Sequence, residues 1–135
     1  MATARIPCID CQKNIDVYVG QSIDDRKLVW HQSSRCHHCG MAMEEDGIGN
    51  IPDELRQLIL EQEGSWCLQI TEIEERAIIA AKILRKLMNL SLPEITKIQK
   101  KIPGEVIIGT HVEMKWLVKN LRAEGLQAFI LPKKI

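Results

Sequence analysis

Two short motifs with the same spacing hold the residues of this chain best suited to chemistry. Cys8-x-x-Cys11 lies near the start, and Cys36-x-x-Cys39 follows after 24 intervening residues. A Cys-x-x-Cys turn aims both sulfur atoms at one point, so two such turns can complete a tetrahedron of four thiolates. The pattern predicts one structural zinc site with these four cysteines as ligands. Iron in the same site stays an alternative.

The same cysteines could instead form two disulfides, a thioredoxin-like redox pair or a catalytic zinc site. The first residues hold no apolar segment typical of a secretory signal, so we expect a cytoplasmic, reducing location that disfavours disulfides. No βαβ pattern surrounds either motif, as a thioredoxin-like pair would require. A catalytic zinc ion keeps one position open, whereas four thiolates would fill its coordination shell.

Other reactive side chains have simpler explanations. His37 and His38 could replace a cysteine as ligands, but we expect them to face solvent between Cys36 and Cys39. The fifth cysteine, Cys67, stands in an apolar run and is expected to be a small buried hydrophobe. A nucleophilic pair of Cys67 with His111 lacks an identifiable carboxylate to orient the histidine.

The segment that positions the cysteines is short of large apolar residues. Alternating side chains predict strands at 14–20 and 27–32, with a turn at 21–25 between them. So small a segment needs a staple such as a metal ion. Residues 5–42 resemble a zinc ribbon, in which two knuckles are carried on hairpins. Gly40 suits the turn of the second knuckle, whereas the first knuckle has no glycine at that place.

A helix is predicted between the cysteine-rich segment and the rest of the chain. Asn50 suits its N-cap, Pro52 its first turn and Gly64 its end. We therefore divide the chain into a zinc-ribbon module at 1–48, a bridging helix at 49–64 and a larger domain at 65–135.

The predicted larger domain alternates strands and capped helices. Three capping-box signatures begin at Thr71, Ser91 and Thr110, each with a glutamate three residues later. The helix after Thr71 is expected to bury five side chains: Ala77, Ile78, Ala81, Leu84 and Met88. With apolar runs at 65–70, 105–109 and 126–131 as strands, the order is βααβαβ. The fold class is therefore α+β.

This order and its residues resemble a known domain. The segment "NLSLPEITKIQKKIPGEVIIGTHVEMKWLVKNLRAEGLQAFIL" is similar to the C-terminal domain of the bacterial ribosomal stalk protein, and the resemblance extends over residues 65–132. It implies an antiparallel three-stranded sheet with helices on one face and a tendency to bind proteins. The dimerisation helices and hinge of that family are replaced by the cysteine-rich module. Its factor-recruiting lysine surface is matched only by Lys97, Lys100 and Lys101.

Charge is divided unevenly between the two halves. Residues 1–63 hold 6 Lys and Arg against 11 Asp and Glu, a balance of −5. Residues 64–135 hold 12 against 7, a balance of +5, so the formal net charge of the chain is zero. This asymmetry favours docking of one half on the other, or two differently charged partners.

Two clusters are candidates for partner binding. Helical periodicity places one on the outer face of the helix that begins after Thr110, where a tryptophan offers apolar area with a basic rim. Its members are Val112, Lys115, Trp116 and Lys119. Docking of Trp116 within the chain is the alternative. The second cluster is acidic and follows the second knuckle: Glu44, Glu45 and Asp46.

Three classes of function follow from these features. We favour a non-catalytic zinc-binding adaptor or inhibitor of another protein, one version being an immunity or antitoxin-type protein that blocks its partner. The alternative is a translation-linked protein that binds the ribosome, a translation factor or RNA. An enzyme is disfavoured, because no glycine-rich phosphate loop or nucleophile–base pair is evident. No membrane partner is expected, because no apolar run reaches about 18 residues. The oligomeric state is left open.

Overall fold

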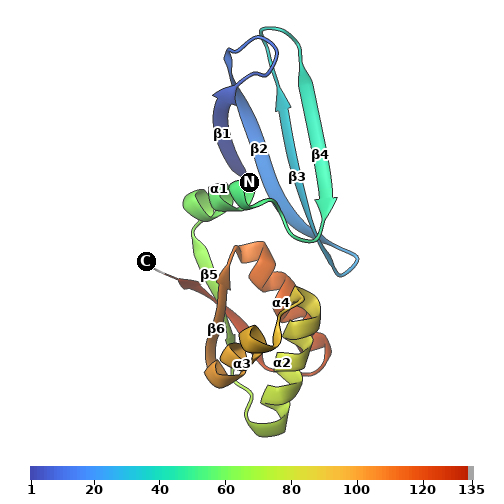
Figure 1. The fold of residues 1–135 in the computed structure, drawn as a ribbon, viewed down its shortest axis with the longest axis vertical. Helices are drawn as coiled ribbons and strands as arrows, with labels where there is room; N and C mark the ends of the chain where they lie inside the picture. Colours follow the sequence, from blue (N-terminus) through green and yellow to red (C-terminus); the bar gives the residue numbers. More distant parts are fainter. Residues whose placement is uncertain (134–135) are drawn as a thin grey trace. The chain divides into compact units, whose positions relative to one another are not determined.

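The computed structural model describes residues 1–133 and has the predicted mixed α+β class (Figure 1). The chain divides into two compact units, Met1–Gly64 and Ser65–Ile135. The last two residues of the second unit, 134–135, lie outside the described residues.

The N-terminal unit is built on a four-stranded antiparallel sheet. Its strands are β1 (Ala2–Pro7), β2 (Asn14–Asp24), β3 (Lys27–Arg35) and β4 (Ala42–Ile48), and they lie in the order β1-β2-β3-β4. The predicted strands at 14–20 and 27–32 are the two central ones. Residues 21–24, which we expected in a turn, continue β2. The turn is tighter, at Asp25 and Arg26, where φ is 47° and 65°.

One helix, α1 (Asp53–Glu63), covers one face of this sheet. Ile51 and Ile59 pack in a small core with Val17, Val19 and Trp30 of the strands. The helix predicted within 49–64 is α1, and it lies in the compact unit Met1–Gly64. The predicted Asn50 cap is corrected: the helix starts after Pro52 and no side chain caps it.

The C-terminal unit follows the predicted βααβαβ order. Its strands are β5 (Ser65–Ile70), β6 (Gly104–Gly109) and β7 (Ala128–Lys133), and its helices are α2 (Glu74–Met88), α3 (Leu92–Lys101) and α4 (His111–Ala123). The sheet is antiparallel with the order β6-β5-β7. The three helices lie together on one side of it (Figure 1).

The core of this unit lies between the sheet and the helices. Leu68 and Ile70 of β5 meet buried side chains of all three helices, including Leu84, Ile95 and Leu117. The predicted burial of Ala77, Ala81 and Leu84 is confirmed, whereas Met88 is only half-buried and Ile78 is 41% exposed.

Two of the three predicted capping boxes form. Ser91 and Thr110 each accept a hydrogen bond from the backbone N–H of the glutamate three residues later, and that glutamate side chain accepts one from the backbone N–H of the cap. The prediction of a capping box at Thr71 is wrong, because α2 begins only at Glu74 and Ile73 is its N-cap residue.

Candidate metal centre

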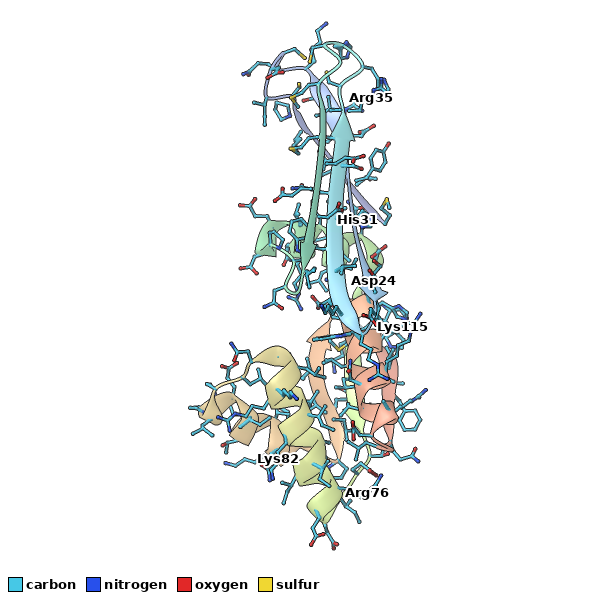
Figure 2. All side chains as sticks on the ribbon, turned by 90° about the vertical axis from the view of Figure 1, so that its right-hand side faces the viewer. Asp24, His31, Arg35, Arg76, Lys82 and Lys115 are labelled. Atoms are coloured by element: carbon cyan, nitrogen blue, oxygen red, sulfur yellow. The ribbon has the colours of Figure 1, made fainter. Side chains whose placement is uncertain are left out.

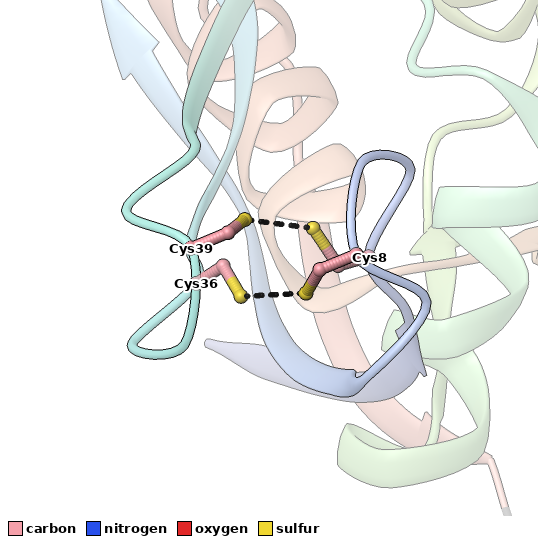
Figure 3. Close-up of side chains that lie close together, drawn as sticks. Cys8, Cys36 and Cys39 are labelled. Carbon is pink, nitrogen blue, oxygen red and sulfur yellow. Dashed lines mark hydrogen bonds between the residues drawn. The ribbon is translucent and has the colours of Figure 1, made fainter.

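The two Cys-x-x-Cys motifs occupy two loops at the same end of the N-terminal sheet. Cys8 and Cys11 lie in the connection from β1 to β2, and Cys36 and Cys39 lie in the connection from β3 to β4. Since β1 pairs with β2 and β2 pairs with β3, the hairpin geometry brings residues 25 or more apart in sequence into contact. Figure 3 shows the cysteine side chains pointing toward one another from the two loops.

Both knuckles have the same backbone hydrogen bonds. The N–H of Cys8 donates to the carbonyl of Lys13 at 2.8 Å, and the N–H of Cys36 donates to that of Met41 at 2.7 Å. In each knuckle the residue after the second cysteine donates back to the first, at 2.9 Å. That residue has positive φ in both, 79° at Gly40 and 69° at Gln12. The first knuckle therefore keeps the shape although a glycine would adopt it more readily.

The four sulfur atoms form one cluster. All of them lie within 4.8 Å of one another. Cys8 Sγ is 3.6 Å from Cys39 Sγ, and Cys11 Sγ is 3.5 Å from Cys36 Sγ (Figure 3). A tetrahedral ion with metal–sulfur bonds of about 2.3 Å would set its sulfur atoms about 3.8 Å apart. The spacing fits such an ion and is far longer than the roughly 2.05 Å of a disulfide.

Burial differs among the four cysteines of the cluster. Cys8 and Cys36 are buried and pack with Ile15, whereas Cys11 is half-buried and Cys39 is exposed. The cluster therefore stands at the surface, with one apolar side toward the sheet.

The thiols have unequal affinities for protons. Hydrogen bonds from the backbone N–H groups of Cys39 and His38 lower the pKa of Cys36 to about 6 against the effect of its burial. A backbone hydrogen bond at Met41 opposes the shift of Cys39, but the loss of water around its sulfur within the cluster and the neighbouring thiols raise its pKa to about 12, although the residue as a whole is exposed. The pKa of Cys11 is also raised, because burial and Cys36 outweigh a backbone hydrogen bond at Lys13. Four thiolates so close together need a cation to offset their repulsion.

His37 and His38 are exposed in the second knuckle. The group that can hold a metal ion, among residues 1–133, consists of the four cysteines without either histidine. Sequence reasoning did not single out Arg5, Tyr18 and Arg35, which line cavities beside this knuckle with the two histidines. A signal was present in part, since Arg35 directly precedes Cys36.

The predicted acidic cluster lies on a strand that follows the second knuckle. Glu44, Glu45 and Asp46 are all exposed on β4, an edge strand of the sheet. Because side chains alternate along a strand, Glu44 and Asp46 share one face and Glu45 lies on the other. Glu45 accepts a hydrogen bond from the side-chain amide of Gln32 at 2.6 Å.

The predicted cluster on α4 is partly buried. Trp116 packs against the core of the C-terminal unit, and Val112 is half-buried, while Lys115 and Lys119 are exposed. Figure 2 shows Lys115 on α4. The backbone carbonyl of Trp116 accepts a hydrogen bond from Asn120 at 2.8 Å.

Cys67 is fully buried and is surrounded by groups other than His111. It pairs across the sheet with Ile108 and Leu131. Burial is the main cause that raises its pKa, and Glu105 adds to the effect. The His111 ring instead packs edge-on against Trp66, with ring centroids 4.5 Å apart. In this arrangement the His111 ring contacts Trp66, and the carboxylate that acts on Cys67 is that of Glu105.

Comparisons of the chain with protein-family models, with curated proteins and with solved structures find no match. Among residues 1–133, no helix has the length and apolar character needed to cross a membrane.

Proposed function

We propose that this chain is a non-catalytic adaptor or inhibitor that binds another protein, with one zinc ion stabilising its N-terminal unit. The observation that carries the proposal is the convergence of four cysteine sulfur atoms from two hairpin ends. Four thiolates complete the tetrahedral shell that zinc prefers, which leaves no position for a substrate or an activated water. When bound, the ion supplies cross-linking of the two loops and neutralises their charge.

The charge of the N-terminal unit supports a basic partner. Its balance of −5 includes three carboxylates on the exposed edge strand β4, at Glu44, Glu45 and Asp46. An immunity or antitoxin-type inhibitor that covers a basic surface of its target is one version of this function. Electrostatic attraction would speed such an encounter and make it sensitive to salt.

A translation-linked function is the second candidate. The βααβαβ order and the antiparallel three-stranded sheet support the proposal that the C-terminal unit has the architecture of the ribosomal stalk C-terminal domain. Its balance of +5 would favour an acidic ribosomal protein, a translation factor or RNA.

Two measurements on the full chain test these proposals. Elemental analysis should find about one zinc per chain, and less than about half would contradict the metal assignment. Affinity capture from extracts of the source cells, followed by mass spectrometry, should find one protein in a stoichiometric complex. Capture of ribosomal particles, weakened by added salt, would support the second candidate and contradict the first.

A further inference from the structure

The face of the N-terminal sheet that α1 does not cover carries a row of polar side chains around one tyrosine. Strand register pairs Tyr18 with Ser33 and pairs Ser33 with Glu44, so these three side chains lie side by side across β2, β3 and β4. Val17, on the alternate position of β2, packs in the core beneath α1. We call the opposite side the open face. Tyr18 is 43% exposed on it.

Two cavities adjoin on the open face and share Tyr18 and Arg35. The first has a volume of about 260 Å³ and lies at the end nearest the cysteines. The second has a volume of about 590 Å³ and extends toward the edge strand, where Ser33, Met43 and Glu44 line it. Figure 2 shows Arg35 at the knuckle end of β3 and His31 farther along the same strand.

The first cavity is rich in hydrogen-bond donors. Arg5, Arg35, His37 and His38 line it together with one carboxylate, that of Asp16. Arg5 lies 3.5 Å from Asp16, and both side chains are more than half exposed, so this ion pair is weak. Arg35 forms no ion pair with any residue in 1–133. A guanidinium with free donors is well suited to a carboxylate, which it can bind through two parallel hydrogen bonds.

The knuckle holds part of this cavity in place. His37 and His38 are the two residues between Cys36 and Cys39, and the carbonyl of Cys36 closes the turn by accepting from Gly40 at 2.9 Å. Cross-linking of the loops by a metal ion would therefore order one wall of the cavity as well as the cysteines. An ordered wall reduces the entropy lost when a ligand binds.

We infer that the open face binds a short extended segment of a partner protein, with an acidic side chain in the first cavity and a basic side chain at Glu44. This inference rests on the proposed adaptor function. Charge complementarity selects the occupant, because the donors Arg5 and Arg35 lie on β1 and β3, on either side of β2, whereas the carboxylate of Glu44 lies on the edge strand β4. Tyr18, between the two cavities, offers the aromatic contact typical of binding hot spots.

The dimensions of the sheet set the spacing of the two charges in the partner. Neighbouring strands are about 4.8 Å apart, so the distance from β2 to β4 across the open face is about 10 Å. An extended chain covers about 3.3 Å per residue, so the acidic and basic residues of the partner segment should be about three positions apart.

Selection from a phage-displayed library of random seven-residue peptides tests this inference on the full, zinc-loaded chain. The enriched peptides should share an Asp or Glu about three positions from a Lys or Arg. The variant Arg35→Glu should weaken their binding at least about tenfold, and selection on it should replace the acidic residue by a basic one. Lys27→Glu makes the same charge change at the other end of β3 and should leave binding unchanged.

Several outcomes would overturn the inference. These are the absence of enrichment, peptides without the acidic residue, and equal binding by the wild type and Arg35→Glu. If Arg35→Glu lowers zinc content without altering the selected peptides, the arginine only balances the thiolate charge.

Arg5→Glu, three positions before Cys8, repeats the test if Arg35→Glu fails to fold. If a captured protein still binds both Arg35→Glu and Arg5→Glu, binding at the open face is contradicted, whereas the adaptor function still stands. If peptide binding depends on Arg35 but no partner protein is captured, the open face stands as a binding site and the adaptor function is contradicted.

Discussion

The four thiols of the cysteine cluster differ in how readily they lose a proton, and Cys36 ionises most readily. Its pKa of about 6 follows from backbone hydrogen bonds at Cys39 and His38, so it is largely a thiolate at neutral pH. The neighbouring Cys39 has a pKa of about 12, because the loss of water around its sulfur and the nearby thiols disfavour a second charge. A divalent cation removes that penalty, and metal binding should therefore release protons from the remaining thiols.

Alkylation should separate the five thiols into two groups. In the zinc-loaded chain we expect little labelling by iodoacetamide, and addition of a chelator should expose four reactive cysteines. Cys67 should react only after denaturation, because it is fully buried and its pKa is raised. Mass spectrometry of the labelled peptides measures each site. If Cys67 is labelled as fast as Cys39 in the chelated chain, the burial of Cys67 is contradicted.

A buried carboxylate joins the start of α2 to the loop before β7. Glu72, whose side chain is 9% exposed, accepts a hydrogen bond from Arg76 at 2.6 Å, and Arg76 also donates to the carbonyl of Gly125. Loss of a hydrogen bond to a charged group costs about 1.5–3 kcal/mol. Glu72→Ala should therefore lower the unfolding free energy of the C-terminal unit by about 2 kcal/mol.

Urea unfolding of the full chain, followed by amide NMR signals of residues 65–133, measures this change. The control is Glu75→Ala, an exposed position one turn onward. Equal midpoints for the two variants would show that the Glu72 contact adds no stability.

Spacing alone was sufficient to find the four cysteines, but it could not find the residues around them. The four form a repeated local pattern, whereas Arg5, Tyr18 and Arg35 come together only through the register of three strands. That register depends on pairing between distant positions, which a single sequence does not display.

At the scale of elements, the same capping-box signature occurs three times, but only two of the three residues cap a helix. Ser91 and Thr110 cap α3 and α4, but Thr71 lies at the end of a strand, where its N–H donates to the carbonyl of Gln127 at 3.3 Å. Glu72 is buried and engaged by Arg76, so the chain turns into the helix two residues after the expected cap. Tertiary contacts therefore override the local capping preference at this position.

Substitution of the two threonines should show the difference. Thr110→Ala removes a buried cap and should destabilise the C-terminal unit by about 1 kcal/mol, the usual cost of losing an N-cap. Thr71→Ala, the matched control with the same sequence signature, should cost far less because its side chain caps no helix. Thermal unfolding of both variants under the same conditions compares them. A loss at Thr71 equal to that at Thr110 would contradict the observed caps.

The strands that the sequence did not predict share a physical cause. β1 reads Ala-Thr-Ala-Arg-Ile-Pro and β4 carries three adjacent acidic residues, so neither shows a continuous alternation of large apolar and polar side chains. Both are edge strands, which bury little surface and tolerate charge. The central strands β2 and β3 have one covered face and were predicted correctly in position, although both are longer than expected.

At the scale of the molecule, the two units differ in how much core they have. The C-terminal unit has one continuous core in which the sheet meets three helices. The N-terminal unit has two small clusters, one beneath α1 and one that consists mainly of cysteines with Ile15. The helix expected as a bridge adds Ile59 to the first of these clusters, and the residue before it, Ile51, packs there too, so residues 1–48 alone hold only part of this core.

Zinc removal from the full chain should consequently affect the two units unequally. A chelator should unfold Met1–Gly64, because its small clusters cannot offset the entropy of ordering about 60 residues without the cross-link. Ser65–Ile135 should stay folded on its own core. Amide NMR spectra should lose the dispersed signals of the first unit and keep those of the second.

Cys36→Ser should reproduce this result, whereas Cys67→Ser, the control outside the cluster, should keep the first unit folded. If both units kept their signals after chelation, the cysteines would not be the staple of the N-terminal unit.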